Sequence, residues 1–344
     1  MEKIMFYILV PVYNVEKYID NSIQSVINQT FTNWNLLLVD DGSTDGCGNI
    51  CDKYSKFDNR IIVLHKKNQG LISARRTAIN YVIDNNQYNN SYVVFLDSDD
   101  SLKENALETI KHYIELSGSE MIIYGMDKIY NNEIIQRFNY NNERMIKNKN
   151  ELYKLVFNNS EYNSLCRKAC SVRLFKKDNY EQYYNLSNGE DLLQSISLYK
   201  LCNSAYIINK SLYNYTVNPS SITHTVNYDN YRIDNTIRKK VFDFLENENV
   251  FNEMDFCQYR SYCISLIIKS LIMISRFDTN IKNKVKLFND IKNDEYFIKY
   301  ISKQKYNKKT LGVKRIIFNL FLKNRYILLI NLIKLYSCVK TENE

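Results

Sequence analysis

The sequence predicts an α/β fold in which a mainly parallel central sheet is flanked by helices, followed by a C-terminal helical region. Short runs of β-branched and aromatic residues alternate with amphipathic segments over the first hundred residues, a pattern typical of βαβ units with right-handed crossovers. These runs are apolar throughout, as expected for strands buried on both faces. After about residue 229 helical spacing replaces them. We therefore expect a sheet domain over 1–228 and a helical, basic region over 229–344.

Composition predicts a globular protein with a large core. The chain has 344 residues, of which 45% are hydrophobic and 24% are charged, and this suits one sizeable domain with a smaller addition. The apolar segment 4–12 is short and lacks a small-residue cleavage site, so we interpret it as the first strand and not as a secretory signal. The 8 scattered cysteines predict reduced thiols and a cytoplasmic protein.

The individual elements follow from hydrophobic periodicity and from turn residues. Strands are predicted at 6–10, 36–39, 61–64 and 93–96, and helices at 16–28, 48–57, 73–83 and 102–116. Asp100 or Ser101 is expected to be the N-cap of the last of these helices. Further along, we expect a strand at 121–124, a polar excursion or β-hairpin at 131–150, and an edge strand or hairpin at 206–215. Helices are predicted at 233–245 and 256–274.

Carboxylates follow two of the predicted strands. Asp97, Asp99 and Asp100 end the run at 93–96, and Asp40 ends the run at 36–39. Ligands of open α/β sheets bind outside the carboxyl ends of the strands. Asp97 and Asp99 point the same way while the chain is extended, which suits a divalent cation such as Mn²⁺ or Mg²⁺. The alternative is an acidic corner that only caps the following helix.

Three more residues suit a nucleoside diphosphate. Asp40 can accept the ring N–H of a base, Tyr13 can stack on its face, and Arg75 can bind the diphosphate. In the alternative interpretation Tyr13 is structural, Asp40 forms a turn with Gly42, and Arg75 pairs across a helix surface. No glycine-rich dinucleotide fingerprint follows the first strand, and no P-loop occurs in the sequence.

Taken together, the motifs resemble those of the family 2 glycosyltransferases in order and spacing. They are Pro11-Val12-Tyr13-Asn14, Gln29-Thr30-Phe31, Val39-Asp40-Asp41-Gly42-Ser43-Thr44-Asp45, Asn68-Gln69-Gly70, Ala74-Arg75 and Asp97-Ser98-Asp99-Asp100. The resemblance covers about the first third of the chain. It implies a GT-A fold and an inverting transfer from a nucleotide-sugar donor, most often a UDP-sugar.

The resemblance also implies roles for single residues. The residues implied to bind the donor are Pro11, Tyr13, Asp40, Arg75, Asp97 and Ser98. Asp99 is implied to bind the metal ion. In such enzymes the pair Asp97-x-Asp99 is the DxD motif, which holds the ribose and Mn²⁺ or Mg²⁺. One departure is Arg76, where the family commonly has Asn. We expect Arg76 either to add positive charge near the phosphates or to face water.

Two further positions have both a structural and a functional interpretation. Glu190 and Asp191 open a predicted helix, where carboxylates are favoured by the helix dipole. The resemblance to the family's Glu-Asp motif implies that Asp191 is the general base, and Glu190 is then expected to orient the acceptor or cap the helix. His224 lies in a predicted loop and would complete the metal ligands, or else is an exposed loop histidine.

The C-terminal region is strongly basic. Residues 296–341 contain no Asp or Glu but many Lys and Arg among apolar residues, as in an amphipathic helix on an anionic membrane surface. An ordinary helix with solvated lysines is the alternative. The charges interrupt any membrane span, and no motif for reading nucleic acid accompanies them. A further alternative is that this region forms the contact between two copies of the chain in a homodimer.

The resemblance thus implies a metal-dependent hexosyltransferase. The family resemblance implies a growing surface or capsular saccharide, free or lipid-linked, as its acceptor. We expect it in the cytoplasm, with a peripheral contact at the inner face of the membrane as an option. The alternatives are a nucleotide-sugar-binding protein without turnover and a scaffold for polysaccharide assembly.

Overall fold

The computed structural model describes residues 3–341 except 132, 185, 187–188, 219–229 and 313. The chain divides into two compact units. The first consists of Met1–Leu152 and Glu161–Thr225, and the second of Tyr153–Ser160 and Val226–Glu344. The short segment Tyr153–Ser160 therefore belongs with the C-terminal helices, although the sheet continues after it along the chain.

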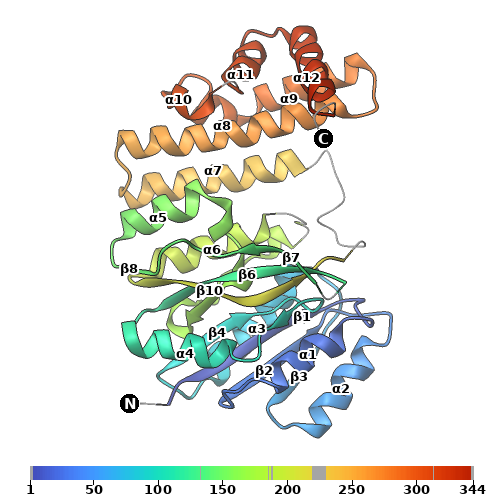
Figure 1. Ribbon diagram of the computed structural model, residues 1–344, viewed down its shortest axis with the longest axis vertical. Helices are drawn as coiled ribbons and strands as arrows, with labels where there is room; N and C mark the ends of the chain where they lie inside the picture. Colours follow the sequence, from blue (N-terminus) through green and yellow to red (C-terminus); the bar gives the residue numbers. More distant parts are fainter. Residues whose placement is uncertain are drawn as a thin grey trace. The chain divides into compact units, whose positions relative to one another are not determined.

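The first unit is built on one mixed sheet (Figure 1). Its described strands are β1 Met5–Val12, β2 Trp34–Asp40, β3 Ile61–His65, β4 Ser91–Phe95, β5 Ser101–Leu102, β6 Met121–Tyr130, β7 Glu133–Phe138, β8 Arg144–Ile146, β9 Lys168–Ser171 and β10 Ala205–Thr216. Their order is β3-β2-β1-β4-β9-β6-β10-β5, with β7 paired to β6 and β8 to β10. Strands β3, β2, β1 and β4 are parallel, and β6 is parallel to β10, whereas β9 runs antiparallel between β4 and β6.

The uninterrupted apolar runs are central strands, as predicted. Every residue of β1 and β4 is buried, so each strand is covered on both faces. Leu9 of β1 lies beside Leu37 of β2 on one side and Phe95 of β4 on the other. The core of this unit thus forms around the β1–β4 pair, whose carboxyl ends carry Tyr13 and Asp97.

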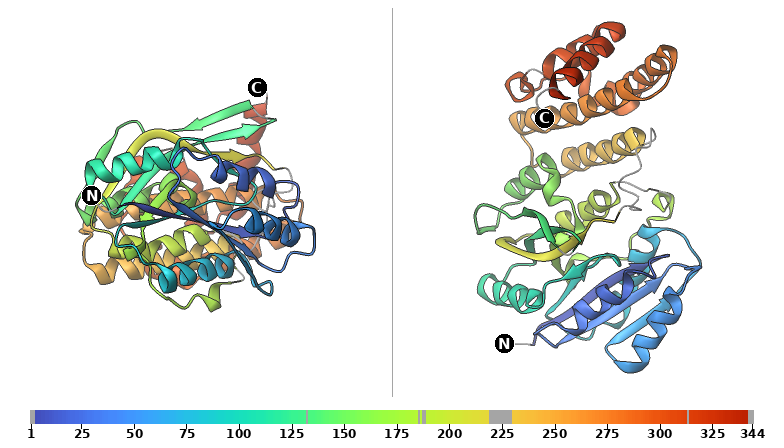
Figure 2. Two further views of the ribbon diagram at one scale, coloured as in Figure 1. Left: turned by 90° about the horizontal axis from the view of Figure 1, so that it is seen from below. Right: turned by 45° about the vertical axis from the view of Figure 1, so that its right-hand side comes forward.

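Helices cover both faces of this sheet. The helices that lie wholly within the first unit are α1 Ile19–Ile27, α2 Cys47–Phe57, α3 Leu71–Asn85, α4 Ala106–Ser117 and α6 Glu190–Leu201. Because crossovers are right-handed, α1 and α2 lie on one face and α3 on the other (Figure 2). The strand order reverses between β1 and β4, which is where such sheets bind ligands.

Two predicted elements were wrong. The helix expected from residue 102 begins at Ala106, and its N-cap is Asn105 and not Asp100 or Ser101. Ser101 and Leu102 instead form β5, which pairs with Asn214 and Tyr213 of β10. Residues 205–216 form one strand with neighbours on both sides, and not an edge strand or hairpin. The pairing of β5 with β10 joins segments about 110 residues apart. The local periodicity of the sequence does not show such pairing, so both predictions failed.

The polar stretch after β6 forms a hairpin, one of the two alternatives expected for it. Strand β7 folds back antiparallel onto β6, so that Asp127 faces Arg137. Asp127 is fully buried and receives hydrogen bonds from Arg137 and from Lys103. Strand β8 then pairs with the start of β10.

The second unit is helical. It contains α7 Asn230–Glu248, α8 Glu253–Arg276, α9 Ile281–Asn293, the π-helix η6 Phe297–Ile301, α10 Lys308–Leu311, α11 Lys314–Leu322 and α12 Tyr326–Thr341, and it shares α5 Lys149–Asn158 with the first unit. Helix α8 begins with a capping box between Asn252 and Asp255. An aromatic core forms where Phe242 of α7 stacks on Tyr300 at 4.5 Å and meets Tyr259 of α8 at 4.7 Å. No helix among the described residues is long and apolar enough to cross a bilayer.

Candidate active site

A buried arginine joins the two acidic motifs. Arg75 lies in the first turns of α3, and only 1% of its side chain is exposed. Its Nη1 donates to Oδ1 of Asp191 at 2.6 Å, and its Nη2 donates to Oδ1 of Asp97 at 2.9 Å. Asp97 follows β4 and Asp191 opens α6, so residues from three elements meet on one guanidinium. The arrangement is a bridge between two carboxylates, and not the helix-surface pair considered in the sequence analysis.

A second segment holds the other oxygens of the same carboxylates. The amide of Leu165 donates to Oδ2 of Asp191 at 3.2 Å, and the thiol of Cys166 donates to Oδ2 of Asp97 at 3.2 Å. Both belong to the 3₁₀ helix η2, Leu165–Arg167. Asp97 and Asp191 are therefore fixed from two sides, by Arg75 and by η2.

Asp100 ties the acidic turn to β10. Its Oδ2 accepts from the hydroxyl of Tyr213 at 2.6 Å, and its Oδ1 accepts from the amide of Thr216 at 2.7 Å. The same tyrosine oxygen accepts from the amide of Asp97 at 3.2 Å. Asp100 thus has a structural task in the sheet, which explains why it does not cap α4.

Asp97 and Asp99 have the chemistry of a cation site. Burial, together with the charge of Asp97, raises the pKa of Asp99, so a nearby positive charge would relieve both effects. The carboxylate oxygens of these two residues are the kind of ligand atom that binds a divalent cation. No group of three or more His, Cys, Asp or Glu side chains among the described residues is arranged to hold a metal ion, and His224 lies outside those residues.

Glu190 lies next to Asp191 in a partly buried position. Burial, with the charge of Asp191, raises the pKa of Glu190 to about 7. A carboxyl whose pKa is raised in this way is common at acid–base sites.

Asp40 belongs to a separate network at the end of β2. Its Oδ1 accepts from the amide of Ser43 at 2.9 Å, and its Oδ2 lies 2.9 Å from Nδ1 of His65. His65 also contacts Asp52 at 3.0 Å. Burial acts to raise the pKa of Asp40, but the hydrogen bonds from Ser43 and His65 outweigh it and lower the pKa.

The loops after β1 and β2 are joined to each other. Asn14 has a left-handed backbone with φ of 52°, and its side chain accepts from the amide of Thr44 at 2.8 Å. Tyr13, just before it, is 48% exposed, so its ring is available to a ligand. Pro11 is buried within β1, and Ser98 is buried between Asp97 and Asp99.

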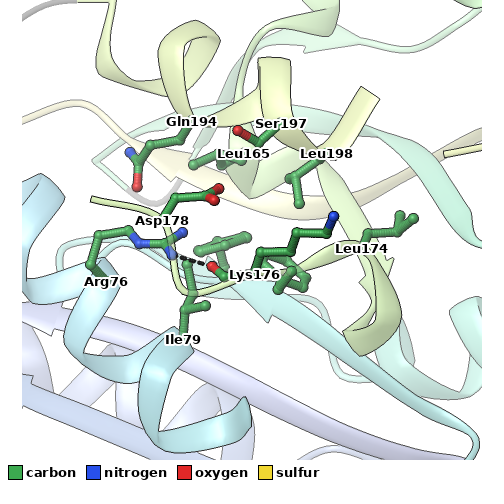
Figure 3. Close-up of a pocket in the computed structure, with 11 residues that line it drawn as sticks. Arg76, Ile79, Leu165, Leu174, Lys176, Asp178, Gln194, Ser197 and Leu198 are labelled. Carbon is green, nitrogen blue, oxygen red and sulfur yellow. Dashed lines mark hydrogen bonds between the residues drawn. The ribbon is translucent and has the colours of Figure 1, made fainter. Parts of the chain in front are cut away.

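A narrow recess lies between α3, α6 and residues 174–178 (Figure 3). Arg76, Ile79, Asp178 and Gln194 are among the side chains that line it. Arg76 is buried, donates to the carbonyl of Lys176 and lies over the ring of Tyr180 at 4.9 Å. The expectation that Arg76 faces water was therefore wrong, because the chain folds back over α3 at this point.

The structure thus brings Arg75, Asp97, Asp99, Glu190 and Asp191 into one cluster, while Tyr13 and Asp40 lie at the ends of β1 and β2. Within the described part of the chain, the hydrogen bonds of Asp40 and those of Asp191 share no residue. Sequence reasoning missed Cys166, His65 and Tyr213. Cys166 lies in the short helix η2, whereas His65 and Tyr213 lie on β3 and β10. Only the folded sheet brings these side chains to the carboxylates.

The comparisons with known proteins agree with this fold and these motifs. The sequence profile described as "Glycosyl transferase family 2" matches residues 7–183, more than half of the chain. "Glycosyltransferase GlyA" of Streptococcus pneumoniae is 29% identical over 63% of this chain and 31% of its own length. "Minor teichoic acid biosynthesis protein GgaB" of Bacillus subtilis is 33% identical over 40% of this chain and 15% of its own. The chain thus corresponds to less than a third of either relative.

The fold matches that of a solved structure. "S. aureus TarS 1-349 in complex with UDP-GlcNAc" has a TM-score of 0.71 at 17% identity and covers 97% of this chain and 91% of that one. At this level of identity the likeness concerns the fold, which here includes the C-terminal helices. On the strength of the profile match, the chain belongs to glycosyl transferase family 2.

Proposed function

We propose that this protein transfers a hexose from a UDP-sugar to a hydroxyl group of a saccharide acceptor, with inversion at the anomeric carbon. The observation that carries the proposal is the convergence of Asp97 and Asp191 on the buried Arg75, with Asp99 close enough to Asp97 to feel its charge. Membership of the glycosyltransferase family and the complex of TarS with UDP-GlcNAc support the donor class.

In this proposal Asp191 is the general base. Its carboxylate takes the proton of the acceptor hydroxyl as the hydroxyl oxygen attacks the anomeric carbon, from the face opposite the diphosphate. A new C–O bond forms, the bond between the sugar and the diphosphate breaks, and UDP leaves with the bonding electrons. The ion pair with Arg75 holds Asp191 in place, and Glu190 orients the acceptor.

Donor binding is assigned to two groups of residues. Asp40 accepts the ring N–H of uracil, Tyr13 stacks on the base, and Pro11 and Ser98 shape the backbone beside it. Asp97 and Asp99 would hold Mn²⁺ or Mg²⁺, with His224 as a further candidate ligand. When bound, the cation supplies positive charge beside the diphosphate. The hydrogen bonds of Arg75 favour a role in holding Asp97 and Asp191 over direct contact with the nucleotide.

A thermal-shift screen of UDP-, GDP- and dTDP-sugars with and without Mn²⁺ tests the donor. A ligand that binds only the native state raises its melting temperature. We expect UDP-sugars, UDP-GlcNAc among them, to raise it most, and Mn²⁺ to enlarge the shift. Asp40→Asn should reduce the shift for UDP-sugars. No shift with any nucleotide sugar would contradict the proposal.

We further propose that the C-terminal helices contact an anionic membrane surface, where a lipid-linked acceptor would be met. Residues 296–341 contain no Asp or Glu. In α12, Ile327, Leu328 and Leu335 are exposed by 62%, 57% and 67%, and Arg325 and Lys334 lie beside them. Apolar and basic side chains on one helix suit the interface of an anionic membrane. A second copy of the chain is the alternative partner of this surface.

A further inference from the structure

A fully buried lysine lies in the centre of the sheet. Lys168 is the first residue of β9, opposite Ile123 of β6. None of its surface is exposed. Its Nζ donates to the carbonyl of Ser164 at 2.5 Å and lies 5.7 Å from the ring centre of Tyr199 in α6. Burying an ammonium group costs free energy unless the charge is paired and hydrogen-bonded, and an apolar residue would fill this core position at lower cost. The presence of a lysine here therefore suggests a role beyond packing.

The carbonyl that Lys168 holds belongs to the segment that fixes both carboxylates. Ser164 comes directly before η2. The next two residues are Leu165, whose amide binds Asp191, and Cys166, whose thiol binds Asp97. Three consecutive residues therefore connect Lys168, Asp191 and Asp97. If Ser164 were released, both Leu165 and Cys166 would be free to move away from the carboxylates.

We propose that Lys168 is a positioning residue for sugar transfer, which acts by holding Ser164 so that η2 fixes Asp191 and Asp97. It does not touch the substrate. The inference rests on the proposed function, because it assigns to Lys168 an effect on the reaction through the general base. A small displacement of a reacting group is enough to slow catalysis strongly, by about a hundredfold for 1 Å.

Lys168 is also the group around β9 that titrates just above neutral pH. Burial lowers the pKa of Lys168 to about 8. The charge of Asp191 acts against this shift and that of Arg167 adds to it. Burial raises the pKa of Cys170 to about 12, and it also raises the pKa values of Cys166, Tyr199 and Tyr124 well above their usual range. Loss of the proton from Lys168 removes its charge and weakens the bond to Ser164.

The test measures release of UDP from UDP-GlcNAc, or from the nucleotide sugar that the thermal-shift screen selects, with water as the acceptor. We expect Lys168→Met to lower kcat by about ten- to a hundredfold and to leave KM for the donor within about threefold of wild type. The matched control is Lys284→Met in α9. Lys284 is likewise buried and donates to a backbone carbonyl, that of Ser275 at 2.8 Å, but this bond lies in the helical unit and not in the segment that fixes Asp97 and Asp191. We expect this control variant to have a lower melting temperature than wild type and an unchanged kcat.

A pH profile separates positioning from packing and does not depend on the folding of Lys168→Met. Wild-type kcat should fall as pH rises through about 8, and Lys168→Arg should move this fall to higher pH because its charge persists. An unchanged kcat in Lys168→Met would overturn the inference but not the proposed function. The same holds if kcat falls at the same alkaline pH in wild type and in Lys168→Arg. If wild type releases no UDP from any nucleotide sugar, both the inference and the proposed function are overturned.

Discussion

At the scale of single residues, the arginine bridge determines what each carboxylate can do. Arg75 is the partner of both Asp97 and Asp191, and it is too buried to exchange either for water. One guanidinium with two carboxylates carries a net negative charge, so the removal of one carboxylate still leaves the arginine a charged partner. This makes Asp191 a residue that can be changed without loss of the fold.

We predict that Asp191→Asn abolishes transfer while it spares donor binding. Without the base, kcat should fall by a factor of about 10² to 10⁴, because the amide cannot take the proton of the acceptor. Asp97 still pairs with Arg75 in this variant, so binding of UDP, measured by calorimetry, should change little.

The control for this prediction is Asp84→Asn, which removes an exposed partner of Lys177 on the same unit. It should retain transfer. If Asp191→Asn also retained full activity, Asp191 would not be the base, and a binding protein without turnover would become the better interpretation of the fold.

At the scale of elements, the long strand β6 is squeezed between β7 and β10. Gly125 of β6 has backbone oxygens on two sides: a Cβ at this position would lie 2.7 Å from the carbonyl of Phe138 and 3.1 Å from that of Lys210. The pairing register between β6 and β10 also shifts here. Glycine within a strand commonly marks such a close approach.

We predict that Gly125→Ala destabilises the protein by about 2–3 kcal/mol, because backbone would have to move as well as the side chain of Asn139, whose Oδ1 would clash with the new Cβ. The measurement is the free energy of unfolding from denaturant titration. Gly118→Ala is the matched control. Gly118 ends α4 at φ of 62°, and nothing lies near its Cβ position. Its substitution should therefore cost only the strain of an alanine in a left-handed backbone conformation, about 1 kcal/mol. Equal losses in the two variants would show that the strands can separate at Gly125.

The contrast between the elements that were predicted and those that were missed has a physical basis. The units from β1 to β4 are encoded locally, since buried parallel strands are apolar throughout and each is followed by its own helix. Strands β5 and β9 are two and four residues long and carry Ser101 and Lys168, so nothing local marks them as strands. They exist because β10, β4 and β6 offer unpaired edges.

The same reasoning applies to the site. Asp97, Asp99, Glu190 and Asp191 could be chosen because carboxylates at strand ends and helix starts are visible in the sequence, and the family resemblance gave them roles. The bridge through Arg75 and the support from Cys166 could not be predicted. They depend on the placement of α3 and η2 against one another, which is a property of the folded sheet.

At the scale of the whole molecule, the protein combines a sheet unit that carries the candidate site with a helical unit that carries the positive charge. The proposed membrane contact can be tested on the full chain. We predict that the double variant Leu328→Asp, Leu335→Asp loses most of its binding to liposomes that contain phosphatidylglycerol, in a flotation assay, since it removes apolar area and adds negative charge.

The matched control is Met254→Asp in α8, which changes an apolar side chain that is 79% exposed in the same unit but outside α12. It should still float. Equal flotation of all three proteins would place any membrane contact outside α12, and no flotation of wild type would remove the membrane from the proposal.

The interleaving of the two units limits how the enzyme can be divided. Residues 153–160 come from the middle of the sheet unit but belong with the helices: Tyr153 and Phe157 have ring contacts with Phe244 at 5.1 Å and 5.8 Å, and Phe157 also with Tyr259. A fragment cut at residue 228 would keep these two aromatic rings and lose Phe244 and Tyr259, against which they pack. Expression of a minimal catalytic fragment should therefore retain α7 and α8, or replace the orphaned rings with polar residues.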